Sequence, residues 1–161
     1  MECISVFDML KIGIGPSSSH TLGPWRAAER WITELKEKNR FSKVEKITVN
    51  LYGSLSLTGK GHATDFAVML GLSGADPERI PVADIDGIVA HIKNTGKLQF
   101  NNETAIPFDF KQDIIFNKQF LPFHANGLSF SALINGRNYK STYYSIGGGF
   151  VVQEERKVSS Q

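Results

Sequence analysis

Cysteine is almost absent from this chain of 161 residues, and its scarcity excludes several kinds of site. The single thiol, Cys3, has no partner for an internal disulfide, which points to a reducing compartment and a cytoplasmic location. One thiol also cannot supply the ligand set of an iron–sulfur cluster or of a cysteine-based zinc site. The sequence therefore predicts no metal site built by this chain alone.

Long apolar runs and an excess of one charge are also missing. No apolar run approaches the roughly 20 residues that cross a bilayer, and residues 1–13 lack the pattern of a secretory signal. The formal net charge is only +2, and basic residues are spread among acidic ones, unlike the basic stripe of a nucleic-acid binder. We therefore expect neither a membrane nor a nucleic acid as partner.

What the chain does contain fits one globular domain. Hydrophobic residues make up 41% and charged residues 21%, which is ordinary for a protein that buries a substantial core. We expect a single domain over residues 1–155, followed by a frayed polar tail at 156–161.

Hydrophobic periodicity predicts an α+β fold. Helices are expected over 21–38, from 62 or 63 to 72, and over 84–94, and a β-branched strand over 44–52. A glycine-punctuated turn is expected over 53–62. After Gly96 the segments become short, aromatic and β-branched, and Asn135-Gly136 predicts a type I′ hairpin between two of them. Because helices precede strands, we expect helices packed on one face of a mixed, mostly antiparallel sheet.

The segment 13–25, GIGPSSSHTLGPW, holds three serines, His20 and Thr21 directly before the first predicted helix. Ser and Thr are favoured helix N-caps, and one cap leaves the other hydroxyls and the imidazole available. Hydroxyls, backbone N–H groups and the positive end of a helix dipole suit a small carboxylate or phosphate. A serine-rich capped turn with a surface histidine explains the same residues equally well.

A second polar segment, 53–65 (GSLSLTGKGHATD), resembles a phosphate loop only superficially. Five residues, not four, separate Gly53 from Gly59-Lys60, and Gly61 stands where a Walker motif needs Ser or Thr. His62 and Asp65 are three residues apart at the start of the next predicted helix, so the carboxylate can orient the imidazole for proton transfer. A capping Thr64, a first-turn Asp65 and an exposed His62 form the alternative interpretation.

The two polar segments would form one pocket if they converged. Each precedes a predicted helix and combines glycine, hydroxyls and histidine, so together they could bind a carboxylate and move a proton. Other polar residues are weaker candidates. Asn126-Gly127 fits a turn, His124 lies in the same loop, His91 lies on an amphipathic helix, and the glycines 147–149 fit a bulge or a close backbone approach.

Three segments carry a family resemblance over most of the chain, from Ile4 to about Glu155. In order they are SVFDMLKIGIGPSSSHTLGP (5–24), YGSLSLTGKGHATDFAVMLGL (52–72) and YYSIGGGFV (143–151). They closely resemble the β domain of the iron–sulfur-dependent L-serine dehydratases, also called L-serine deaminases or L-serine ammonia-lyases. That domain is similar to the allosteric substrate-binding domain of some D-3-phosphoglycerate dehydrogenases, which supports the α+β fold.

The resemblance implies a lyase of serine catabolism and gluconeogenesis. In that family L-serine loses water and then ammonia to give pyruvate, while a 4Fe-4S cluster acts as Lewis acid and a base takes the α-proton. Cysteines of a separate α domain or α subunit hold the cluster, so this chain alone would be inactive. The implied partners are L-serine, the α portion and further copies in a homo-oligomer. The alternative is a regulatory module that binds serine or a small anion without catalytic residues.

The resemblance also implies which residues form the β side of the serine site. The catalytic candidates are His20, His62 and Asp65, and the substrate-binding candidates are Ser17, Ser18, Ser19, Thr21, Gly61 and Thr64. Hydroxyls and backbone N–H groups would hold the carboxylate, and one histidine would transfer the proton with Asp65 as orienting partner. Left open are which histidine acts, whether the base comes from the missing portion, and whether the chain is a subunit or an excised domain.

Overall fold

The computed structural model of the protein describes residues 18–59 and 64–155. The helices are α2 (Leu22–Glu37), α3 (Gly53–Gly59), α4 (Thr64–Leu72) and α5 (Val82–Thr95), with a 3-10 turn η1 (Phe41–Lys43) after α2. The strands are β1 (Lys46–Tyr52), β2 (Lys97–Phe100), β3 (Thr104–Pro107), β4 (Ile114–Asn117), β5 (Gly127–Ile134), β6 (Arg137–Gly147) and β7 (Phe150–Gln153). None of the helices in these described ranges is long and apolar enough to cross a bilayer.

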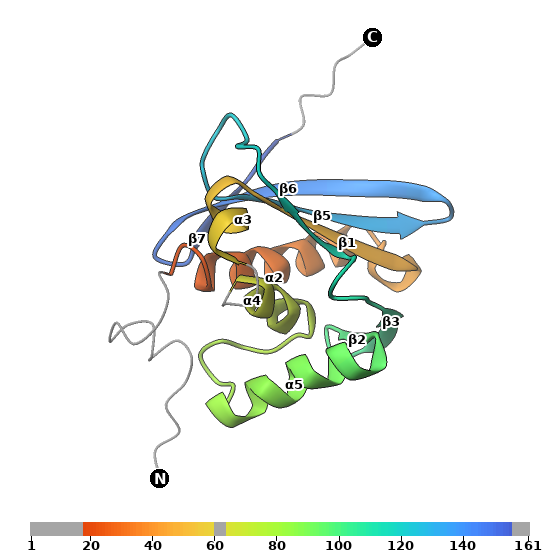
Figure 1. The fold of residues 1–161 in the computed structure, drawn as a ribbon. Coiled ribbons are helices and arrows are strands. Elements are labelled where there is room, and N and C mark those ends of the chain that lie inside the picture. The colour runs from red at the N-terminus through yellow and green to blue at the C-terminus, as the bar shows by residue number, and fades with distance from the viewer. Residues whose placement is uncertain (1–17, 60–63, 156–161) are drawn as a thin grey trace.

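The described elements form three layers (Figure 1). The top layer is a five-stranded sheet in the order β4-β1-β5-β6-β7, in which β4 runs parallel to β1 and the other neighbours are antiparallel. Helices α2 and α4 lie under this sheet, and α5 lies below them with the separate β2–β3 hairpin. The predicted α+β fold, with helices on one face of a mixed, mostly antiparallel sheet, is confirmed. The likeness to the phosphoglycerate dehydrogenase domain stays a prediction, as do the domain bounds.

Alternating side chains of the sheet build the core beneath it. Successive residues of a strand point to opposite faces, so Ile47, Val49 and Leu51 of β1 share one face, and all three belong to the core. Val49 of β1 pairs with Phe130 of β5, both fully buried, and Trp31 of α2 stacks on Phe130 with ring centroids 5.0 Å apart. Aromatic pairs of this kind stabilise a fold beyond the effect of the apolar area that they bury. The stack therefore fixes α2 against the centre of the sheet.

Local signals in the sequence predicted several element boundaries well. Asn135 and Gly136 have φ values of 51° and 76°, and two positive φ values are what a type I′ hairpin turn requires. Helix α5 begins after Pro81 and ends at Gly96, whose φ of 66° is left-handed and whose N–H donates to the Ile92 carbonyl. Both features depend on residues close in sequence, which explains why they could be predicted.

Helix α3 corrects the prediction of a turn over 53–62, at least as far as Gly59. Its first two N–H groups are satisfied from outside the helix: Gly53 donates to the Gln119 carbonyl (2.9 Å) and Ser54 to the Ala125 carbonyl (3.0 Å). Leu55 is fully buried beneath the helix. Glycine and serine are poor helix formers, so this short helix depends on tertiary contacts that local propensity does not show.

Glu34 lies between α2 and the sheet, although its place on the polar side of the predicted helix gave no sign of this. Its carboxylate accepts hydrogen bonds from Tyr143 Oη (2.6 Å), Lys38 Nζ (2.8 Å), Gln153 Nε2 (3.0 Å) and Ser141 Oγ (3.1 Å). Burial alone would raise the pKa of Glu34, but the hydrogen bonds from Lys38, Tyr143 and Ser141 lower it below its usual value. Burial and the Glu34 charge in turn raise the pKa of Tyr143.

Replacing Glu34 by glutamine is expected to lower the free energy of unfolding at pH 7 by about 1–3 kcal/mol, because hydrogen bonds to a charged group are lost. A carboxyl whose folded pKa is lowered stabilises the fold above its unfolded pKa, near 4.5, and loses that effect as the pH falls further. The difference between wild type and Glu34→Gln should therefore shrink toward pH 3. Urea unfolding at both pH values measures it, and an undiminished difference at pH 3 would contradict the pKa assignment.

Candidate functional site

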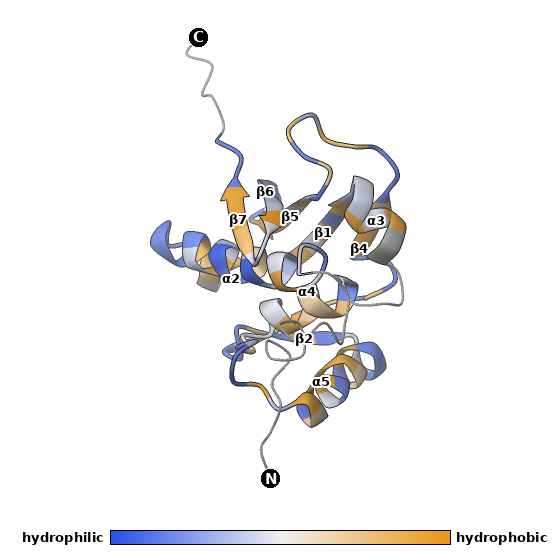
Figure 2. Cartoon of the chain, turned by 90° about the vertical axis from the view of Figure 1, so that its left-hand side faces the viewer, coloured by the Kyte–Doolittle hydropathy of each residue, from blue (hydrophilic) through white to orange (hydrophobic). Residues whose placement is uncertain are grey.

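Three helices begin at the same end of the five-stranded sheet. Helix α3 follows directly on β1, α2 begins beside the end of β6, and α4 lies against α2. Figure 2 looks onto this end, where α3, α4 and the start of β7 face the viewer. Helix starts carry unpaired N–H groups and partial positive charge, so their convergence creates a polar environment suited to an anion.

His20 joins the two polar segments that the sequence singled out. Its Nε2 atom is hydrogen-bonded to Ser54 Oγ (2.9 Å), and its Nδ1 atom to Ser19 Oγ (2.8 Å). Thr64 Oγ1 donates to the His20 carbonyl oxygen at 2.6 Å. The segment before α2 therefore contacts both α3 and α4, and the convergence on which the site prediction depended is confirmed for the described residues.

Two predicted site residues at the start of α4 are almost fully buried. Thr64 is 1% exposed and Asp65 is 7% exposed. The Asp65 carboxylate accepts the N–H of Phe66 at 2.9 Å, which holds the carboxylate at the first turn of the helix. Burial and hydrogen bonding fix both side chains, while their roles toward a substrate stay predictions.

The start of α2 offers fewer backbone donors than its sequence suggests. The Gly23 N–H donates to the Ser18 carbonyl (2.9 Å), and Pro24 has no N–H. Of the N–H groups of α2 residues 22–25, the described contacts therefore leave at most that of Leu22 for a ligand. Thr21 occupies the N-cap position, but its side chain makes no capping hydrogen bond. The expected Ser/Thr side-chain cap of α2 is therefore wrong at Thr21, because the Ser18 carbonyl takes that role.

The glycines 147–149 bring β6 and β7 against the segment before α2. All three have positive φ, and the β6–β7 register shifts between Ser145 and Gly147, which confirms the predicted bulge. The Gly148 N–H donates to Ser18 Oγ at 3.2 Å. A Cβ on Gly149 would lie 2.8 Å from Leu22 Cδ2, so it is a side chain, and not the predicted neighbouring backbone, that packs closely on this glycine.

Ser145 and Gly23 form the tightest contact at this end of the sheet. A Cβ on Gly23 would lie 1.7 Å from Ser145 Oγ, which leaves no room for a side chain. Ser145 is fully buried, and its hydroxyl has no hydrogen-bond partner among the residues that the structure describes. The Ser145 backbone is held by Asn126, which accepts its N–H and donates Nδ2 to its carbonyl. Asn126 is thus a structural residue, as its predicted turn role implied.

Three predicted site residues, Ser17, Gly61 and His62, lie outside the described residues. Conversely, Ser54 was not named as a site residue, although it contacts His20. Its position inside the second polar segment was visible, but the segment was interpreted as a turn. The missing signal was the helix α3, which directs Ser54 toward His20.

A cluster does not fit the residues of this chain. Iron–sulfur clusters are held mainly by cysteine thiolates, and the one cysteine, Cys3, lies outside the described residues. In the described ranges no group of three or more His, Cys, Asp and Glu side chains is placed to hold a metal ion. Any cluster that serves this site must therefore be ligated elsewhere.

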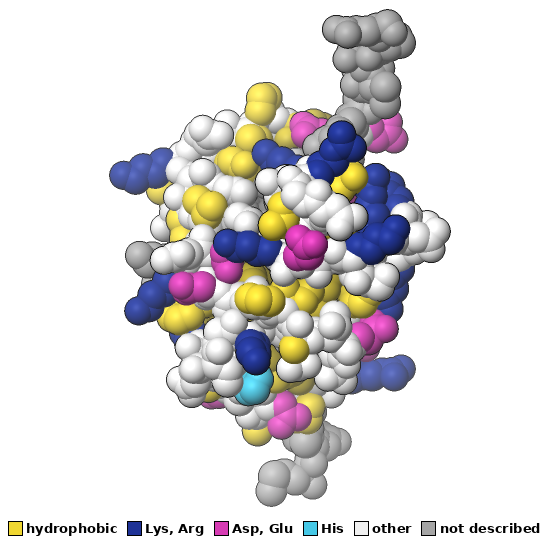
Figure 3. Space-filling model, turned by 90° about the vertical axis from the view of Figure 1, so that its right-hand side faces the viewer, with side chains coloured by type: hydrophobic (Ala, Val, Ile, Leu, Met, Phe, Trp, Pro, Cys, Tyr) yellow, Lys and Arg dark blue, Asp and Glu magenta, His cyan; other side chains and the backbone are white. Residues whose placement is uncertain are grey.

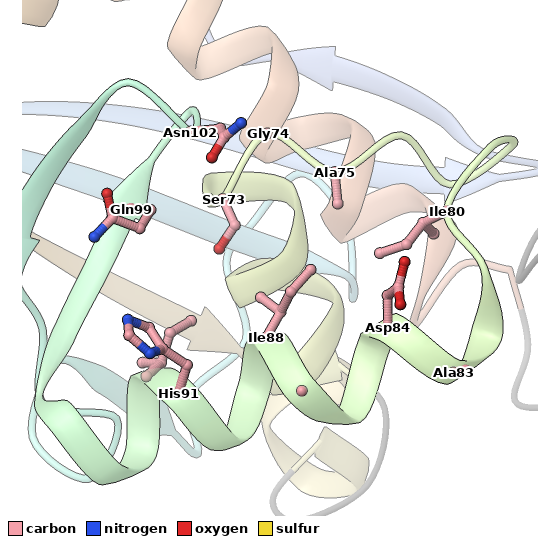
Figure 4. A pocket seen from close by; sticks show the side chains of 12 residues that line it. Ser73, Gly74, Ala75, Ile80, Ala83, Asp84, Ile88, His91, Gln99 and Asn102 are labelled. Carbon is pink, nitrogen blue, oxygen red and sulfur yellow. The ribbon is translucent and has the colours of Figure 1, made fainter.

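A separate hollow of about 590 Å³ lies between α5 and β2 (Figure 4). Its polar groups include Asp84 and His91 of α5 and Gln99 of β2, and its floor includes Ile80 and Ile88. His91 thus faces an open groove, far along the chain from the converging helix starts. This hollow shares no lining residue with the contacts around His20.

The sequence comparisons identify the family of the chain. The chain is 47% identical over 154 residues to an L-serine dehydratase of Haemophilus influenzae, and 45% identical over 157 residues to L-serine dehydratase 1 of Escherichia coli. It is 43% identical over 155 residues to an L-serine dehydratase of Streptomyces coelicolor. Each match covers 94% of this chain but only 34% of the relative. A sequence profile described as serine dehydratase beta chain matches residues 5–156, so the chain belongs to the serine dehydratase beta chain family.

Proposed function

We propose that this chain forms one wall of the substrate site of an L-serine ammonia-lyase, which converts L-serine to pyruvate and ammonia. The relatives named L-serine dehydratase support the reaction. The hydrogen bond between His20 and Ser54 is the main support for the proposed position of the site, because it joins the two segments richest in hydroxyls and histidine. The chain spans about a third of those relatives, so the other wall belongs to the part that it lacks.

The hydroxyls before α2 suit the carboxylate of L-serine. Ser18, Ser19 and Thr21 stand at the positive end of a 16-residue helix, which favours a negative group. Since α2 offers at most one first-turn N–H, the side-chain hydroxyls supply most of the hydrogen bonds. Ser17 and Gly61 belong to the same proposal by sequence position. Thr64 is buried and bonded to the His20 carbonyl, which supports a positioning role for its hydroxyl.

We assign proton transfer to His62 and positioning to His20. Both imidazole nitrogens of His20 are hydrogen-bonded to hydroxyls of this chain, so the ring connects the segment before α2 to helix α3. A general base needs a nitrogen that can reach the proton it removes. His62 is the other histidine that the resemblance implies, and it stands three residues before Asp65 in the sequence, so we propose Asp65 as its orienting partner.

The remaining features of the proposal concern the complete enzyme. A 4Fe-4S cluster, held by cysteines of the part that this chain lacks, would supply Lewis-acid chemistry at the substrate hydroxyl when bound. We further propose a cytoplasmic homo-oligomer, for which the single cysteine and the family membership are the support.

Anaerobic reconstitution tests this function. The chain is combined with the part of the Haemophilus influenzae enzyme that its match leaves out, and pyruvate formed from L-serine is measured. Turnover by the mixture, with none by either part alone, is the expected result. A mixture that assembles but forms no pyruvate would contradict the proposal.

Calorimetry of the isolated chain separates the regulatory alternative from the catalytic one. A one-walled site should bind L-serine weakly, because half of its contacts are missing. Tight binding of L-serine or phosphate without the other part would favour a regulatory module instead.

A further inference from the structure

Exposed apolar side chains gather at the end of the molecule that carries the candidate site. Seven large apolar side chains are exposed in the described part of the chain. Five of them lie in α3, in the loop between β4 and β5, at the end of β6 and at the start of β7, and we call these five the apolar rim: Leu57 (65% exposed), Phe120 (57%), Phe123 (66%), Ile146 (48%) and Phe150 (71%). Single exposed apolar residues are ordinary, but a contiguous group marks an interaction surface.

Two rim residues are tied to the site through α3. A Cβ on Gly53, the first residue of α3, would lie 2.7 Å from Phe120 Cδ1, so the ring lies directly over the start of this helix. Leu57 follows Ser54 by three residues in α3, and residues at this spacing share a helix face. Because Ser54 bonds to His20, the same helix presents both a site residue and a rim residue.

The other rim residues belong to the β4–β5 loop, the end of β6 and the start of β7. Phe123 packs on Tyr144 of β6 with ring centroids 4.8 Å apart. Ile146 follows Ser145, which touches Gly23 at the start of α2. Phe150 lies against Gly148, whose N–H donates to Ser18 Oγ. Across the sheet order from β4 to β7, the rim follows one end of the sheet over about four strand spacings of about 4.8 Å each.

The segments that carry the rim also lack formal charge. No Lys, Arg, Asp or Glu occurs in 18–25, 53–59, 119–127 or 145–150, although 21% of all residues in the chain are charged. The opposite face of the molecule instead intersperses basic and acidic side chains (Figure 3). Aromatic enrichment and depletion of charge distinguish the buried centre of a protein interface from other surface.

We propose that the apolar rim is the surface on which the remaining portion of the serine dehydratase docks. The occupant follows from chain length, because the relatives are about three times as long as the part matched here. It also follows from position, since a portion seated on the rim closes the open side of the site around His20. This inference rests on the proposed function for the identity of the partner, but the surface is argued from the structure alone.

Binding of separated parts tests the rim. The probe is the part of the Haemophilus influenzae L-serine dehydratase that lies outside the match, produced as its own chain, and the Kd is measured by biolayer interferometry. The double variant Phe123→Ser, Phe150→Ser should raise the Kd about 100-fold, because each interface aromatic is expected to contribute about tenfold. Leu57→Gln, which keeps a good helix former in α3, should weaken it about tenfold.

The matched control is Val82→Ser with Ile115→Ser, the two exposed apolar residues outside the rim, and it should change the Kd less than twofold. Thermal melts confirm that each variant is folded.

Three outcomes would overturn the proposal: unchanged binding by the rim variants, an equal loss of binding in the control, or no binding by the wild type. Rim-dependent self-association without probe binding would overturn it in favour of a second copy. Rim-dependent binding without pyruvate formation would instead reject the proposed function while keeping the surface.

Discussion

Replacing His62 by alanine is expected to lower kcat of the assembled enzyme by about 10²- to 10⁴-fold, the usual contribution of a positioned acid–base group. Replacing His20 should act differently, because its imidazole bridges Ser19 and Ser54 and both of its nitrogens are already engaged. His20→Ala should therefore raise KM for L-serine more than it lowers kcat. Steady-state kinetics of pyruvate formation separate the two outcomes.

Ser54 supplies the internal control for this assignment. If His20 acts by positioning Ser54, then Ser54→Ala should reproduce the KM effect, and the double variant should be no worse than either single variant. His91→Ala, a histidine of the groove beside α5, should leave both kinetic constants unchanged. A loss of kcat in His20→Ala as large as in His62→Ala would reverse the roles given to the two histidines.

The parts of the fold that could be predicted from the sequence are those fixed by neighbouring residues. The alternation in β1, the Asn135-Gly136 turn and the end of α5 at Gly96 depend on side-chain period or backbone freedom within a few positions. These preferences act before any long-range contact forms. They were sufficient to predict the fold class and the order of the described strands and of helices α2, α4 and α5.

The failures of prediction arise where long-range contacts decide the local structure. Helix α3 is a glycine- and serine-rich segment whose first N–H groups find acceptors in the β4–β5 loop, about 70 residues further along the chain. Glu34 was assigned to the polar side of a helix, yet four side chains converge on it, three of them from β6 and β7. Sequence periodicity cannot show a partner that only folding brings near.

The candidate site combines features that could be predicted from the sequence with features that could not. Its residue types were visible because Ser, Thr, His and Gly cluster before helices for physical reasons. The contact between His20 and Ser54 was not visible in the sequence, since it joins two residues 34 positions apart and depends on a helix, α3, that was not expected. The expectation that a Ser or Thr side chain caps this helix has a related outcome: Thr21 at the N-cap makes no such bond, and the Gly23 N–H donates to the Ser18 backbone carbonyl.

Replacing Gly23 by alanine is expected to disrupt the start of α2 and the site with it. An alanine Cβ would lie 1.7 Å from Ser145 Oγ and 2.6 Å from Ser145 Cβ, and both groups are fully buried. Overpacking of a core costs about 1–3 kcal/mol and occasionally more, and a contact this short belongs at the upper end of that range. Urea unfolding measures the loss, and the KM for L-serine of the assembled enzyme should rise as Ser18 and His20 shift.

Two further variants test whether the clash with Ser145 is the cause. Gly87→Ala, the matched substitution inside α5, meets no atom within 4 Å and should stabilise the protein by about 0.5–1 kcal/mol, because alanine is the better helix former. In Gly23→Ala with Ser145→Gly the opposing side chain is gone, so most of the lost stability should return. The return is incomplete because glycine in a strand costs about 0.5–1 kcal/mol of its own. A Gly23→Ala variant as stable as wild type would show that the first turn of α2 can move away from β6, and the close fit that orients His20 would then not be needed.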